Sequence, residues 1–140
     1  MPHGLSKSRL LAYRQCPKRL WLNVYRRELE EVSEQAAFAF GHGRNIGTVA
    51  RSLQPDGILI ETDDLAEALA ATRRIMAEQP DRPIFEATFE HAGVLVRADV
   101  MTPEANGYRM TEVKASTGVK DYHLTDCAIQ TWVCQQAGIP

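Results

Sequence analysis

Two alternating segments separated by a turn constrain the fold of this chain most strongly. Residues 94–101 and 108–115 each have the apolar alternation of a β-strand, and the segment 103–107, with a proline and a glycine at its ends, forms the turn between them. Because side chains alternate with period 2 along a strand, Glu112 and Lys114 should point to the same face. Asp99 joins them if the strands pair. Such charges on an apolar sheet are costly unless they are paired or hold a metal ion.

Periodicity in the rest of the chain predicts an α/β protein. A further strand is expected at 84–90, joined to 94–101 by a short hairpin turn, so that three antiparallel strands follow one another. The core is expected to be a helix, this three-stranded sheet and a second helix. The remaining predicted elements are a short strand at 57–61 and helices at 34–53, 65–78 and 122–137.

The chain has 140 residues, enough for one domain, 1–140. We expect a basic helical entry segment at 5–32 and a core at 33–140. The chain ends where a further strand would be expected, which predicts an N-terminal fragment whose last strand is missing.

The entry segment is predicted to form a helix that begins after Ser6 and breaks near Cys16, because Pro17 interrupts the pattern. Residues 1–53 carry nine Lys or Arg against four Asp or Glu, whereas the remainder carries seven against fourteen. This asymmetry suits a surface that binds a phosphate backbone beside a cation site. An ordinary solvated helix face is the alternative. The candidate DNA-binding residues are Lys7, Arg9, Lys18 and Arg19.

Composition excludes several classes of protein. No apolar run approaches 18 residues and the N-terminus lacks the apolar core of a signal peptide, so no membrane association is expected. The three cysteines are odd in number and widely spaced, which argues against a disulfide framework. A cytoplasmic location is therefore expected.

The two carboxylates suggest a site for a divalent metal ion such as Mg²⁺, which prefers oxygen ligands. Asp99 and Glu112 would supply them, with the Val113 carbonyl as a third ligand and Glu86 acting through water or as a second base. Lys114 would orient or deprotonate a water molecule, or stabilise charge on the transition state. The alternative is a Glu112–Lys114 ion pair on a solvated sheet edge.

Asp99 followed by Glu112-Val113-Lys114 resembles the PD-(D/E)XK nuclease superfamily. The flanking sequences LSKSR at 5–9 and CPKRLW at 16–21 look like the N-terminal signature of RecB-type nucleases and their CRISPR-associated relatives. Gln130 falls where that group carries a glutamine on the helix after the lysine strand.

The resemblance implies a restriction-endonuclease-like fold and hydrolysis of DNA phosphodiester bonds with Mg²⁺ or Mn²⁺. Asp99 and Glu112 would be the metal carboxylates, Lys114 the catalytic lysine, and Gln130 an active-site or DNA-contact residue. Several relatives hold an iron–sulfur cluster with one cysteine from the entry motif, a position that Cys16 fits. The other three would lie beyond residue 140, so a 4Fe–4S cluster is expected only in a longer chain; otherwise Cys16 is a packed helix residue.

The chain also departs from the family pattern. Gly47 stands where RecB-type members carry a histidine, and Cys134 stands where they carry a tyrosine. These departures motivate an alternative function, a non-catalytic nucleic-acid-binding or assembly module that retains the nuclease fold. A third, weaker alternative is a phosphate-processing enzyme of another fold, in which Asp99 and Glu112 never meet.

Overall fold

A mixed sheet of five strands forms the centre of the fold. The computed structural model describes residues 4–30 and 46–139. The strands are β1 (Leu5–Ser6), β2 (Ile58–Leu59), β3 (Ile84–His91), β4 (Val94–Glu104) and β5 (Gly107–Thr111). The predicted antiparallel order β3–β4–β5 is confirmed, while β1 runs parallel to β4 and β2 parallel to β3. Since β3 occupies one edge of β4, β1 and β5 share the other edge, at opposite ends.

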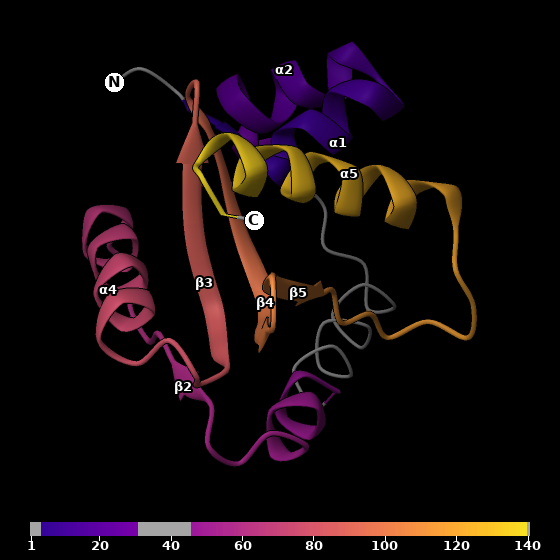
Figure 1. The fold of residues 1–140 in the computed structure, drawn as a ribbon. Coiled ribbons are helices and arrows are strands. Elements are labelled where there is room, and N and C mark those ends of the chain that lie inside the picture. The colour runs from indigo at the N-terminus through magenta and orange to yellow at the C-terminus, as the bar shows by residue number, and fades with distance from the viewer. Residues whose placement is uncertain (1–3, 31–45, 140) are drawn as a thin grey trace.

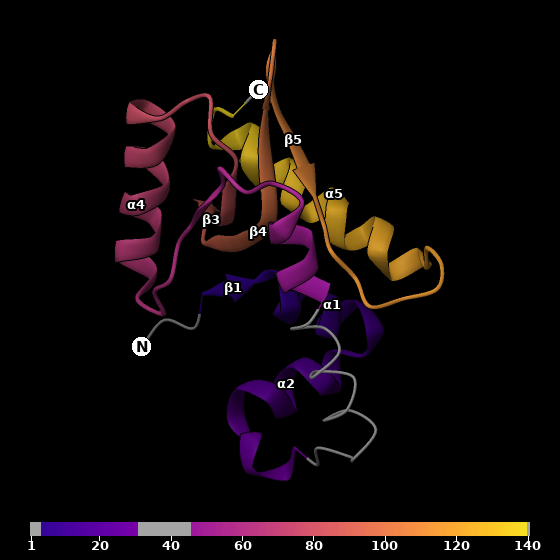
Figure 2. The same ribbon diagram turned by 90° about the horizontal axis from the view of Figure 1, so that it is seen from below.

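Helices surround this sheet (Figures 1 and 2). They are α1 (Lys7–Gln15), α2 (Pro17–Tyr25), the short 3-10 helix η1 (Arg27–Leu29), α4 (Leu65–Glu78) and α5 (Asp121–Gln136). Figure 1 shows α1 and α2 near the end of the sheet where β3 turns into β4, with α5 crossing beside them. Residues 46–52 are helical, and the rest of the helix predicted at 34–53 lies largely outside the described residues. Within the described ranges, no helix is long and apolar enough to cross a membrane.

Local signals set the helix boundaries. The Ser6 hydroxyl accepts a hydrogen bond from the Arg9 amide at 3.3 Å and caps α1. At Cys16 the backbone is extended (φ −165°), and α2 starts at Pro17, so the predicted break is confirmed. The Asp64 carboxylate caps α4 in the same way.

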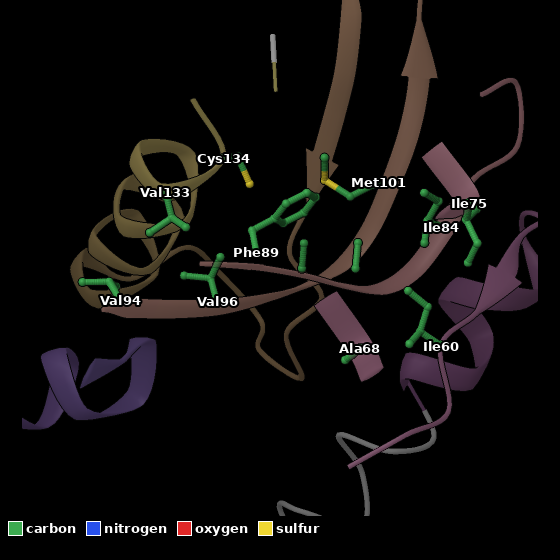
Figure 3. Close-up of a cluster of buried hydrophobic side chains, with 12 residues drawn as sticks. Ile60, Ala68, Ile75, Ile84, Phe89, Val94, Val96, Met101, Val133 and Cys134 are labelled. Atoms are coloured by element: carbon green, nitrogen blue, oxygen red, sulfur yellow. The ribbon is translucent and has the colours of Figure 1, made fainter. Parts of the chain in front are cut away.

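The hydrophobic core joins the sheet to both α4 and α5 (Figure 3). Ala68 and Ile75 come from α4, and Val133 and Cys134 come from α5. From the two long strands, the buried members are Ile84, Ala87, Phe89, Val94, Val96, Ala98 and Met101. This core fixes β3 and β4 against two helices.

The two long strands change face at Glu86 and Asp99. Simple alternation predicts that Phe85 continues the core face of Ala87, but Ile84 enters the core cluster instead. The register on either side pairs Phe85 with Val100 and Ala87 with Ala98, so Glu86 lies opposite Asp99, but these two residues do not form a ladder pair. Glu86 has a positive φ of 60°. Such a conformation is strained by roughly 1–3 kcal/mol and is common at functional sites.

Candidate active site

Strand β5 ends earlier than predicted, at Thr111 rather than at residue 115. Continuing the Val100–Thr111 register by one pair would place Glu112 opposite Asp99. Instead, the Val113 amide donates a hydrogen bond to Asp99 Oδ2 at 2.7 Å. The Val113 amide therefore bonds to the Asp99 side chain and not to a backbone carbonyl of β4. The chain leaves the sheet at this point, next to the acidic residues Asp99 and Glu112.

Asp99 and Glu86 line a cavity of about 420 Å³ beside this junction. Its other lining residues are Val100 and Val113 from the sheet side, and Gly47, Thr48, Ala50 and Arg51 from the helical segment 46–52. The break in the β3–β4 ladder therefore brings two carboxylates into one space. We refer to it as the Asp99 cavity.

Asp99 is a partly buried carboxylate without an ion-pair partner among the described residues. Its pKa is raised to about 6: burial is the largest cause, the negative charges of Glu112 and Glu86 act in the same direction, and the Val113 hydrogen bond and Lys7 act against it. A proton or another cation at Asp99 is therefore favoured.

Glu112 belongs to a different group of side chains, the lysine–carboxylate cluster, formed by Lys7, Glu112, Lys114, Asp126 and Gln130. Lys7 Nζ lies 3.0 Å from Glu112 Oε1 and 3.0 Å from Asp126 Oδ1. Lys114 pairs with the same two acids, at 2.9 Å from Asp126 Oδ2. The Glu112 and Asp126 side chains are only 5% and 2% exposed. Two ammonium groups thus balance two buried carboxylates, as burial of charge requires.

Gln130 completes the cluster from α5. Its Nε2 donates to Glu112 Oε2 at 2.6 Å and lies 3.2 Å from Asp126 Oδ1. The opposite amide orientation would point an acceptor at two acceptors, so these contacts define the amide orientation. Gln130 Oε1 is buried, with no hydrogen-bond partner in residues 4–30 and 46–139.

The contacts in the cluster outweigh the effect of burial on its charges. Burial lowers the pKa of Lys114, but its bonds and attraction to Glu112 and Asp126 raise the pKa above its usual value. Burial likewise raises the pKa of Asp126, but Lys114 and Lys7 hold that pKa below its ordinary range. Lys114 is thus an ammonium and Asp126 a carboxylate at neutral pH.

The structure brings together some predicted site residues and separates others. Glu112, Lys114 and Gln130 are in contact in the cluster, whereas Asp99 and Glu86 line the neighbouring cavity. Glu112 is not among the residues that line the Asp99 cavity, and its two carboxylate oxygens are bound by Lys7, Lys114 and Gln130.

The candidate DNA-binding residues of the entry segment also differ in placement. Lys7 was expected on a surface facing phosphate, but its side chain is 19% exposed and its ammonium lies inside the cluster. Arg9 donates to the Gly4 carbonyl at 2.6 Å. Lys18 and Arg19 are exposed on α2, and Cys16 is exposed at the break before it.

Asp126 is the one cluster member that the sequence reasoning missed. A local signal for it exists, because Asp126 and Gln130 are four residues apart and share one face of a helix. Since Gln130 was predicted to lie in the active site, Asp126 on the same helical face could have been predicted to lie there too. Its partner Lys7 was also assigned a different role.

Asp99, Glu86 and Val113 line the Asp99 cavity, and carboxylate and carbonyl oxygens are the ligands that Mg²⁺ and Mn²⁺ prefer. Asp99, whose partly buried carboxylate has no ion-pair partner within 4–30 and 46–139, fits such a cation together with Glu86. Protein side chains alone would not complete the coordination of this ion. Across the described part of the chain, no three His, Cys, Asp or Glu residues lie close enough together to hold a metal ion. Water and substrate oxygens would complete the coordination, as is usual for Mg²⁺.

Comparison of this chain with protein-family models, with curated proteins and with solved structures finds no match. The resemblance to the PD-(D/E)XK superfamily therefore stays a prediction from sequence motifs. The fold itself is a mixed α/β arrangement with a five-stranded sheet.

Proposed function

We propose that this protein is a metal-dependent nuclease that hydrolyses DNA phosphodiester bonds where β4 and β5 diverge, on a restriction-endonuclease-like core. The hydrogen bond from the Val113 amide to Asp99 Oδ2, 2.7 Å long, is the observation that carries the proposal. It joins the aspartate of the predicted motif to the Glu112-Val113-Lys114 segment, which periodicity alone places only on a neighbouring strand.

In this proposal, Asp99 and Glu86 would hold Mg²⁺ or Mn²⁺, with the Val113 carbonyl as the third ligand predicted from the sequence. When bound, the cation polarises a phosphate oxygen as a Lewis acid. Asp99 is oriented toward this task by the Val113 amide, which leaves its other carboxylate oxygen for a ligand.

Lys114 supplies a second positive charge. Its side chain is 35% exposed and lines a cavity of about 440 Å³ with Glu112 and His123. Because Glu112 and Asp126 bind its ammonium, Lys114 is fixed in position and suited to stabilise charge that develops on the phosphate. Of the roles considered from the sequence, these contacts favour charge stabilisation over removal of a proton from water.

The test is cleavage of a labelled DNA oligonucleotide in Mg²⁺ or Mn²⁺, with EDTA as the metal-free control. Asp99→Ala and Lys114→Ala should each lower the rate by at least about a hundredfold, because the first removes a proposed ligand of the cation and the second removes the charge proposed to stabilise the phosphate. The exposed Asp63→Ala is the matched control. Circular dichroism checks that the variants fold. Undiminished cleavage in both site variants would sink the proposal.

A second candidate is a non-catalytic nucleic-acid-binding or assembly module. The observation that favours it is that both carboxylate oxygens of Glu112 already accept hydrogen bonds, from Lys7, Lys114 and Gln130, and so are not free to bind a metal ion. Titration with Mn²⁺, followed by electron paramagnetic resonance, separates the two candidates. Saturable Mn²⁺ binding that Asp99→Asn abolishes favours the nuclease, and no binding at millimolar Mn²⁺ favours the module.

A further inference from the structure

Arg51 lines the Asp99 cavity from the helical segment 46–52. Its guanidinium forms one side-chain hydrogen bond, from Nη2 to Thr48 Oγ1 at 3.2 Å. Among residues 4–30 and 46–139 it forms no ion pair, although Glu86 and Asp99 line the same cavity. A guanidinium has five N–H donors, so most of its donors are uncommitted with respect to this part of the chain.

Gly47 makes room for this arrangement. Residues 47 and 51 are four apart in the helical segment and share one face. A Cβ atom at position 47 would lie 3.6 Å from Arg51 Nη1. Alanine would therefore just touch the guanidinium, while a longer side chain would occupy its space. The position of the Arg51 guanidinium therefore depends on the absence of a long side chain at residue 47.

The cavity needs such a cation if it is to receive a phosphate. Two carboxylates repel a phosphodiester, and one divalent cation held by Asp99 and Glu86 only balances their charge. A guanidinium matches two phosphate oxygens in a bidentate manner, which an ammonium does not do. Arg51 provides this group at the wall of the cavity.

We propose that Arg51, seated over Gly47, binds the phosphate of the substrate in the Asp99 cavity. This inference rests on the proposed function, for which it names the phosphate-binding residue. Arg51 is then a substrate-binding group, and Gly47 is the position that admits it.

The experiment measures binding and cleavage of one labelled single-stranded DNA oligonucleotide. Binding is measured by fluorescence anisotropy in Ca²⁺, and cleavage in Mg²⁺. The variants are Arg51→Gln, Arg51→Lys, Gly47→Ala and Gly47→Leu, with Arg74→Gln on α4 as the matched control for loss of one exposed arginine.

Arg51→Gln should weaken binding and lower kcat/KM by roughly 10- to 100-fold, the range for a lost hydrogen bond to a charged group. Arg51→Lys should recover only part of this, because it keeps the charge and loses the planar fork. Gly47→Leu should resemble Arg51→Gln, and Gly47→Ala, whose Cβ would only touch the guanidinium at 3.6 Å, should have a smaller effect in the same direction. The double variant Gly47→Leu/Arg51→Gln should be no worse than Arg51→Gln alone, since both changes remove the same contact.

The outcomes separate this inference from the proposed function. If the wild type cleaves DNA and Arg51→Gln behaves as Arg74→Gln, the role of Arg51 is overturned and the nuclease activity stands. If the wild type binds DNA without cleaving it, and Arg51→Gln weakens binding, the role of Arg51 in phosphate binding stands and the nuclease activity fails. A wild type that neither binds nor cleaves overturns both.

Discussion

Lys7 Nζ on α1 lies 3.0 Å from Asp126 Oδ1 on α5. This contact joins the basic entry segment to the helix that carries Gln130, and both residues also contact partners near the end of β5. The entry segment is therefore part of the candidate site and not only a surface beside it. Because Asp126 is almost fully buried, its charge depends on the two lysines that surround it.

Replacing Lys7 by methionine should destabilise the protein by about 2–3 kcal/mol. The change leaves Glu112 and Asp126 with one ammonium between them, and removing one partner of a buried ion pair is strongly destabilising. Urea unfolding at pH 7 measures the effect. Lys18→Met on the exposed face of α2 is the control and should change the free energy of unfolding by less than about 0.5 kcal/mol. Equal effects in the two variants would show that the cluster does not depend on Lys7.

Asp126→Asn should lower kcat for DNA cleavage by about tenfold while KM changes by less than about twofold. The substitution keeps the size of the side chain but removes half of the negative charge that fixes the Lys114 ammonium. A misplaced charge affects the transition state more than substrate binding. Steady-state kinetics of Asp126→Asn and of the exposed control Asp63→Asn measure this. A change confined to KM would instead assign Asp126 to substrate binding.

Asp99 should make the free energy of unfolding depend on pH. Its folded-state pKa of about 6 lies above the ordinary value of about 3.9, so the folded state binds more protons between these pH values. Stability should therefore fall as pH rises from about 4 to about 6. Since the group is partly exposed, we expect an effect of about 1–2 kcal/mol after allowance for solvent screening.

Asp99→Asn should remove this dependence. In metal-free buffer the variant should be about 1–2 kcal/mol more stable than the wild type at pH 8 and nearly equal to it at pH 4. Asparagine can still accept the Val113 hydrogen bond, which makes the comparison one of charge alone. Urea unfolding at several pH values measures both proteins. Parallel pH profiles would contradict the prediction.

Gly57→Ala should destabilise the protein by roughly 1–3 kcal/mol through overpacking. A Cβ atom at position 57 would lie 2.2 Å from Cε2 of the buried Phe85 ring and 3.1 Å from the Gln54 carbonyl oxygen. Gly118→Ala is the control, because its Cβ would meet no atom within 4 Å. Thermal unfolding of the two variants should therefore differ, and equal midpoints would contradict the packing of Phe85 against the turn before β2.

Elements with strong local signals were predicted from the sequence with little error. The capping aspartate and the apolar stripe place α4 at Leu65–Glu78, as predicted, and the break at Cys16 follows from Pro17. Alternation finds β3 and β4 correctly but fails at Glu86 and Asp99. There, two opposed carboxylates lie at a break in the ladder, and the core face shifts by one residue on each strand. Period 2 holds only while the ladder is unbroken.

By itself, the sequence determined where α1, α2, α4, α5, β3 and β4 lie, and that Glu112 and Lys114 lie close together. Those features depend on caps, proline and apolar spacing, which act over a few residues. Only the tertiary structure decided that Lys7 and Asp126 share the cluster, that β5 stops at Thr111, and that Arg51 lines the Asp99 cavity. Each of these depends on distances between groups far apart in the chain. A buried charge is stabilised by whichever partner lies nearest in space, and spacing along the sequence does not specify that partner.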